Sequence, residues 1–138
     1  MAGTGGMASM LSEAGMKRAL QQYLDGFNQG DAEAIISLFA DDARIEDPVG
    51  GGKIVAGNAA ITAFYTRAVE VVERLDLDTP IRGSRGRSAA MAFTIRLKSD
   101  AEASQQGTVI RVIDVMTFNE SGKIVDMKAF HGFSDVSR

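Results

Sequence analysis

The sequence contains no cysteine and a single histidine, His131. Without cysteine there are no disulfides, no thiol catalysis and no cysteine-ligated metal, and one histidine excludes a histidine-rich metal site. The sequence also lacks any apolar run near the ~20 residues that a bilayer-spanning helix needs. We therefore expect no metal and no membrane span.

Positive charge is also scarce, since the formal net charge is −3 and no cluster of Lys and Arg stands out. Arg82, Arg85 and Arg87 lie close together, but their glycine and serine neighbours indicate a solvated hairpin turn. We therefore expect no nucleic-acid partner. The first residues lack the charged region and apolar stretch of a signal peptide, which predicts a cytoplasmic protein.

The chain has 138 residues, of which 45% are hydrophobic, and this suits one domain with one core. Residues 1–10 are rich in glycine and are interpreted as a flexible tail or an artificial extension. Residues 11–138 are then expected to form a single domain.

Periodicity predicts helices in the first half of the chain and strands in the second. Helical spacing indicates a helix from Ser9 or Ser12 to Asn28, a short one from Ala32 to Phe39 and a third from Ala59 to Val72. Alternating patterns indicate strands at about 43–47, 53–55, 75–84, 87–97, 107–118 and 124–133. This order predicts an α+β fold, in which a long antiparallel sheet curls and three helices close its concave side.

Asp114 lies in the middle of an almost wholly apolar strand pattern, residues 108–118. Arg111 is the only charge on the opposite side of that strand, so the opposite side is the better solvent face and Asp114 points toward the core. A lone buried carboxyl ordinarily escapes its desolvation cost by a raised pKa and a bound proton. Asp114 is therefore a candidate neutral hydrogen-bond donor.

Two further polar groups point inward by the same test. Tyr23 lies within the apolar stripe of the first helix, so its hydroxyl needs a buried partner. Asp47 shares a strand face with Ala43 and Ile45, and Pro48 ends that strand. A strand end holds a side chain firmly and leaves it open to a ligand.

Each of these residues also has a purely structural explanation. Tyr23 could be a core tyrosine with its hydroxyl at the rim, and Asp47 could cap a turn before Pro48. Asp114 could pair with a buried arginine, either Arg111 or Arg96. The three residues together, on separate elements, favour a catalytic site.

The sequence resembles steroid delta-isomerase (ketosteroid isomerase), within the nuclear transport factor 2-like and SnoaL-like superfamily. Residues 23–31, 38–50 and 60–65 carry the resemblance, most specifically the run Glu46-Asp-Pro-Val-Gly50 together with Tyr23 and Asp114. The resemblance implies a cone-shaped curved mixed sheet wrapped by three N-terminal helices, and a homodimer. Ketosteroid isomerase is itself a standard example of a carboxylic acid kept neutral by an apolar site.

The resemblance also implies residue roles, with no cofactor. Asp47 matches the general base, Tyr23 and Asp114 match the two donors to the developing oxyanion, and Tyr65 matches a tyrosine bonded to the catalytic one. The reaction would move the double bond of a 3-oxo steroid from the 5,6 to the 4,5 position, so the partner is an apolar steroid-like molecule. Further substrate-binding candidates are Phe93, Val112, Met116, Phe118, Phe130 and His131.

Two other functions fit the same fold. SnoaL-like cyclases and epoxide hydrolases use other acid–base sets on cyclic ketones or polyketides, and His131 keeps that option open. A non-catalytic module that binds an apolar ligand is the second alternative. Asp47 discriminates against it, because a binding module has no use for an ionised base beside an apolar ligand.

Overall fold

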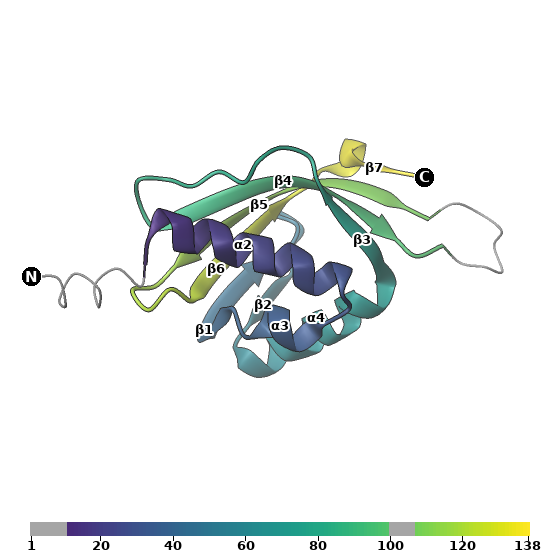
Figure 1. Ribbon diagram of the computed structural model, residues 1–138. Helices are drawn as coiled ribbons and strands as arrows, with labels where there is room; N and C mark the ends of the chain where they lie inside the picture. Colours follow the sequence, from purple (N-terminus) through teal and green to yellow (C-terminus); the bar gives the residue numbers. More distant parts are fainter. Residues whose placement is uncertain (1–10, 100–106) are drawn as a thin grey trace, which may run out of the picture.

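Three helices pack against one face of a curved sheet (Figure 1). The computed structural model describes residues 11–99 and 107–138. The predicted tail at 1–10 and nearly all of the predicted connection at 99–106 lie outside these residues. Within the two described ranges, no helix is both long enough and apolar enough to cross a membrane. The arrangement confirms the predicted α+β class.

Within the described residues, the α-helices are α2 (Glu13–Asn28), α3 (Ala32–Ile36) and α4 (Asn58–Val71). Ser12 precedes α2, and its hydroxyl oxygen accepts a hydrogen bond from the backbone N–H of Gly15 at 3.0 Å. This satisfies one of the donors that a helix start leaves unpaired. The apolar face of α2 is buried as its spacing predicts, with Met16, Leu20, Tyr23, Leu24 and Phe27 turned to the sheet.

Seven strands form one sheet, and their bounds are β1 (Phe39–Glu46), β2 (Ile54–Ala56), β3 (Val72–Leu77), β4 (Ser88–Leu97), β5 (Val109–Phe118), β6 (Ile124–Phe130) and β7 (Val136–Ser137). The predicted second helix, 32–39, is too long. Phe39 instead pairs with Ile124, and the backbone N–H of Ile124 donates to the carbonyl of Leu38 at 2.9 Å. Pairing with a distant strand therefore overrides the local helical pattern.

The strand order is β2-β1-β6-β5-β4-β3, with β7 added on β5. Neighbours are antiparallel except β1 and β6, which run parallel with Ile45 opposite Met127. The sheet is therefore mixed. This parallel pair brings the end of β1 beside the residues that follow β6.

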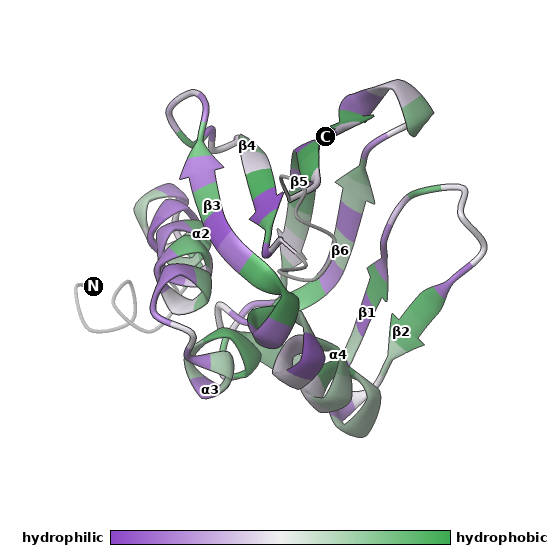
Figure 2. Cartoon of the chain, turned by 90° about the vertical axis from the view of Figure 1, so that its right-hand side faces the viewer, coloured by the Kyte–Doolittle hydropathy of each residue, from purple (hydrophilic) through white to green (hydrophobic). Residues whose placement is uncertain are grey.

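The core lies between the helices and the concave face of the sheet. Along β5, Val112, Asp114, Met116 and Phe118 are buried, while Arg111 and Ile113 are exposed. Figure 2 shows both hydrophilic and hydrophobic stretches along β3 and β4. Burial alternates over the first half of β4 as well, where Ala89, Met91 and Phe93 are buried and the two alanines between them are only partly buried. The alternation confirms that Asp114 points into the core and Arg111 away from it.

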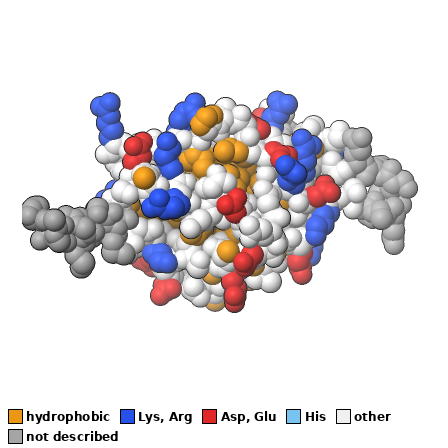
Figure 3. Space-filling view, viewed as in Figure 1, with side chains coloured by type: hydrophobic (Ala, Val, Ile, Leu, Met, Phe, Trp, Pro, Cys, Tyr) orange, Lys and Arg blue, Asp and Glu red, His pale blue; other side chains and the backbone are white. Residues whose placement is uncertain are grey.

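The surface seen in Figure 3 carries charged side chains around its rim, and its hydrophobic side chains gather toward the middle. Most of the apolar surface of the sheet and helices is turned inward. The exposed hydrophobic side chains include Ile113 and Phe130 on the convex face of the sheet.

Candidate active site

Asp114 is held in the middle of β5 with only 1% of its surface exposed. Its cross-strand neighbours are Met91 on β4 and Ala129 on β6. Its Oδ2 atom is the one buried side-chain nitrogen or oxygen, within residues 11–99 and 107–138, that has no hydrogen-bond partner. A buried polar atom without a partner calls for an explanation, and a ligand that completes it is one.

Neither of the two arginines considered as ion-pair partners of Asp114 pairs with it. Arg111 is exposed on the opposite face, and Arg96 forms an ion pair with Asp76 at 3.0 Å. Burial raises the pKa of Asp114 well above its usual value, and the charge of Asp47 raises it further. Asp114 is therefore a neutral acid that can donate a hydrogen bond.

Tyr23 on α2 and Tyr65 on α4 face each other, and their hydroxyl oxygens are 2.9 Å apart. The Tyr65 hydroxyl also lies 3.6 Å from the sulfur of Met127, to which it can donate. Burial raises the pKa of both tyrosines well above 10.0. Both phenols therefore stay protonated at neutral pH, and Tyr23 is a second neutral donor.

Asp47 follows the last residue of β1, where the strand gives way to a glycine-rich turn. Its side chain is 27% exposed, far more than that of Asp114. Its Oδ1 atom lies 3.0 Å from Nε2 of His131, which follows β6. The parallel pairing of β1 with β6 creates this contact between residues far apart in the sequence, so no local sequence pattern predicts it.

Tyr23, Asp47 and Asp114 line one hollow of about 110 Å³ between the helices and the sheet. The other lining residues are apolar: Phe27, Phe64, Ala68, Val72, Leu75, Phe93, Ile95 and Leu97. Two neutral donors and one carboxylate thus meet in an apolar space. Such a set can take a proton from a carbon next to a carbonyl and stabilise the oxygen on which charge develops.

The substrate-binding candidates occupy several different places. Phe93 lines the hollow, and Tyr65 lies behind Tyr23. Val112, Met116 and Phe118 are buried on the same face as Asp114 but do not line the hollow.

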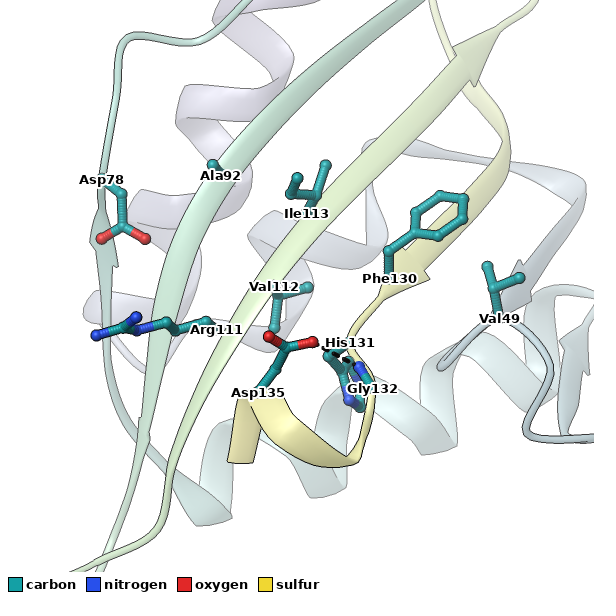
Figure 4. Close-up of a pocket in the computed structure, with 10 residues that line it drawn as sticks. All are labelled: Val49, Asp78, Ala92, Arg111, Val112, Ile113, Phe130, His131, Gly132 and Asp135. Carbon is teal, nitrogen blue, oxygen red and sulfur yellow. Dashed lines mark hydrogen bonds between the residues drawn. The ribbon is translucent and has the colours of Figure 1, made fainter. Parts of the chain in front are cut away.

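Phe130 lies on the opposite face of the sheet and is 44% exposed. It belongs to an outer pocket of about 430 Å³ that also holds Ile113 and Arg111 (Figure 4). Phe130 shares its strand face with Lys128 rather than with Ala129, and this parity was already visible in the sequence. His131 lines that outer pocket too, while its ring reaches Asp47.

Several lining residues were not singled out from the sequence. Phe64 and Ala68 lie along α4 on the side of Tyr65, at helical spacing. Ile95 and Leu97 continue the alternation that begins at Phe93. Extending each periodic pattern outward from a candidate residue would have found all four.

No group of three or more His, Asp or Glu side chains within the described ranges is placed to hold a metal ion. The fold and this hollow define a small α+β protein in which a tyrosine and two aspartates share an apolar hollow under the helices.

Comparison with known proteins identifies the family. The family model described as a SnoaL-like domain matches residues 20–127, and the chain belongs to that family. A protein named steroid Delta-isomerase, from Nocardioides simplex, is 37% identical over 123 residues, which are 89% of this chain and 94% of that protein.

Two similar proteins have names of another kind. Epoxide hydrolase LasB from Streptomyces lasalocidi is 28% identical over 128 residues, which cover 93% of this chain but 45% of that protein. The solved structure of SalBIII matches with a TM-score of 0.81 and 29% identity, covering 92% of this chain and 98% of that one. SalBIII is described as an epoxide hydrolase/cyclase-like enzyme in pyran ring formation in the polyether salinomycin.

Proposed function

We propose that the protein is a steroid delta-isomerase that moves the double bond of a 3-oxo steroid from the 5,6 to the 4,5 position. The observation that carries the proposal is the unpaired carboxyl of Asp114, which lies in one hollow with Tyr23 and Asp47. The similarity to the steroid Delta-isomerase of Nocardioides simplex supports the same choice of substrate.

In the proposed reaction, Asp47 takes a proton from the carbon between the ketone and the double bond. The electron pair of that C–H bond shifts toward the ketone and leaves a dienolate with negative charge on its oxygen. Tyr23 and Asp114 donate hydrogen bonds to that oxygen, more strongly as its charge grows. Asp47 then returns the same proton to the far carbon of the dienolate, which completes the isomerisation without loss or gain of atoms.

Neutral donors suit this hollow better than cationic ones, because a buried cation would carry its own desolvation cost. The depth of the three groups also fits the proposal. Tyr23 and Asp114 are almost fully buried, whereas Asp47 is partly exposed. The ketone would therefore lie deep, with the proton-transfer carbons nearer the opening.

The volume of the hollow sets a further condition. About 110 Å³ is less than the roughly 300 Å³ at the lower end of pockets for drug-sized ligands. We infer that the ring bearing the ketone occupies the hollow and that the rest of the molecule extends outward past Asp47. An apolar, steroid-like ligand meets that condition if its distal rings remain partly exposed.

The decisive experiment is the conversion of androst-5-ene-3,17-dione to its conjugated isomer, followed as rising ultraviolet absorbance. Asp47→Asn is expected to lower kcat by about 10²–10⁴-fold, because it removes the general base, and to leave steroid binding intact. The matched control is Glu46→Gln, which changes the adjacent carboxylate on the other face of β1. That variant is expected to stay within about twofold of the unaltered protein. A protein that binds the steroid and does not isomerise it would contradict the proposal.

Epoxide opening is the second candidate, and the similarity to LasB and SalBIII favours it. In that reaction, neutral Asp114 would donate a proton to the epoxide oxygen while Asp47 takes one from the attacking hydroxyl or water. Turnover of an epoxide together with no isomerase activity would select this alternative. The homodimer implied by the resemblance remains a prediction, which size-exclusion chromatography with light scattering would test.

A further inference from the structure

His131 and Asp47 form a contact between the hollow and the convex side of the sheet. Asp47 lines the hollow. His131 lines the outer pocket of about 430 Å³ and also a second outer pocket of about 540 Å³, which the turn after Asp47 helps to form. The side chains are partly exposed, 17% for His131 and 27% for Asp47. The imidazole therefore touches the proposed base and remains within reach of water.

The chemistry of the two groups fixes the direction of their hydrogen bond. An ionised carboxylate can only accept, so Nε2 of His131 must carry the hydrogen that lies between Nε2 and Oδ1. In the neutral ring the other nitrogen, Nδ1, is then unprotonated. The bond occupies Oδ1 and leaves Oδ2 of Asp47 to meet a substrate proton.

Other charged groups face His131 from the elements packed around it. Asp135, in the short 3-10 helix η1 (Phe133–Asp135), lines the same outer pocket and accepts a hydrogen bond from the backbone N–H of Gly132 at 2.7 Å (Figure 4). Arg111 on β5 and Asp78 after β3 lie at the far side of that pocket. The hydrogen bond of the His131 ring is nevertheless to Asp47, which lines the inner hollow and not this outer pocket.

We propose that His131 is the positioning residue of the proposed base. Its neutral ring orients Asp47 for proton abstraction, and a second proton on the ring weakens that base. This inference rests on the proposed isomerase function. It gives His131 a role other than the substrate contact for which the resemblance made it a candidate.

The effect of the second proton follows from electrostatics. An imidazolium beside Asp47 stabilises the charged carboxylate, and a carboxylate stabilised in this way takes a substrate proton less readily. Histidine is the side chain that ordinarily changes charge between about pH 5 and 8. Protonation of the ring at low pH should therefore lower isomerase activity.

Two substitutions separate positioning from charge. His131→Gln retains an uncharged N–H donor, so kcat is expected to remain within about threefold of the unaltered protein at pH 8. His131→Leu has no donor, and kcat is expected to fall about tenfold with little change in KM. In both variants the loss of activity between pH 8 and 5 should be smaller than in the unaltered protein.

Asp135→Asn is the matched control, because it neutralises a carboxylate that lines the same outer pocket as His131 and keeps an acceptor for the N–H of Gly132. It should retain the full pH dependence. Equal kcat values for the Gln and Leu variants would overturn the positioning role. An unchanged loss of activity at low pH in His131→Gln would overturn the role of the ring charge.

A second measurement does not depend on catalysis. Since His131 is the only histidine of the chain, its ring gives one set of ¹⁵N–¹H signals. We expect a hydrogen-bonded Nε2–H resonance in the unaltered protein and in Asp135→Asn, and its loss in Asp47→Ala. Persistence of that resonance in Asp47→Ala would overturn the inference. Absence of isomerase activity with the resonance present would instead overturn only the proposed function.

Discussion

Two aspartates on opposite faces of the same sheet have opposite pKa shifts. Asp114 on β5 points into the core, where burial, and next the charge of Asp47, raise its pKa. Asp76 on β3 points outward between Arg74 and Arg96, and the hydrogen bond from Arg74, followed by that from Arg96, lowers its pKa. Position on the sheet, and not residue type, decides whether each carboxyl is an acid or an anion.

The difference shows how one residue type can serve chemistry or the surface. Asp76 is partly exposed and already pairs with two guanidinium groups, those of Arg74 and Arg96. Asp114 has apolar neighbours and an oxygen without a partner. The second arrangement costs stability unless a ligand completes it, and functional sites are where such costs are tolerated.

The largest expected effect is on catalysis at the inner aspartate. Asp114→Ala should lower kcat by roughly 10²–10³-fold, because one donor to the oxyanion is lost. Asp114→Asn keeps an N–H donor, so its loss should be clearly smaller. Asp76→Asn is the control on the outer face and should leave kcat unchanged. Equal losses in Asp114→Ala and Asp114→Asn, measured in the isomerase assay, would argue against a donor role.

The next effect is on stability: substitution of Asp114, which should lower kcat, should raise the free energy of unfolding at neutral pH. Folding raises the pKa of Asp114. Below about pH 4 the carboxyl is neutral in both the folded and the unfolded protein. Above that pH it ionises in the unfolded protein while it is still neutral in the folded one. The free energy of unfolding should then fall by up to about 1.4 kcal/mol per pH unit, until Asp114 ionises in the folded state as well.

Asp114→Asn removes that loss and should therefore become increasingly more stable than the unaltered protein as the pH rises above 4. Urea unfolding at pH 4, 6 and 8 measures the difference. A constant difference across these pH values would show that Asp114 ionises alike in the folded and unfolded states.

A smaller effect on kcat is expected for Tyr65, whose hydroxyl contacts that of the proposed donor Tyr23. Tyr65→Phe removes the hydroxyl 2.9 Å from that of Tyr23 and leaves the ring in place. The net value of such a hydrogen bond is about 0.5–1.5 kcal/mol, so kcat should fall about two- to tenfold. Phe64→Leu, on the same helix and also at the hollow, is a control for packing. A kcat for Tyr65→Phe equal to that of the unaltered protein would separate Tyr65 from catalysis.

The smallest effect belongs to the outer aspartate. The pKa of Asp76 is lowered by folding, so its contribution to stability is present above about pH 4 and is lost as the pH falls through the folded-state value. Exposed ion pairs contribute less than about 1 kcal/mol, and salt screens them. Asp76→Asn should thus destabilise slightly at pH 7 in low salt and less at pH 3, by urea unfolding. A larger loss at pH 3 than at pH 7 would contradict this sign.

Local periodicity was enough to predict the inward direction of Tyr23 and Asp114. Each lies in a pattern long enough to define a face, one helical and one alternating, and both are almost fully buried. The α+β class followed from the order of those patterns, and the structure and its SnoaL-like relatives confirm it. The roles of Tyr23, Asp47 and Asp114 remain proposals for the assays above.

The contacts that depend on distant pairing could not be predicted in this way. The end of the second helix and the bond between Asp47 and His131 both follow from the β1–β6 register, which has no local signature. The place of Phe130 is different, since its parity with Lys128 was readable and had simply not been applied. The contacts of the site that could not be predicted are those that depend on which strands pair and in which register.

The parallel pairing of β1 with β6 also has a consequence for biosynthesis. Asp47 is translated early, yet the strand and the imidazole that hold it come from the last stretch of the chain. A nascent polypeptide that stops before residue 124 already contains both tyrosines and Asp114 and has no neighbour for β1 on that side. Proton abstraction, the chemistry proposed for Asp47, would accordingly be acquired only once β6 and His131 have left the ribosome.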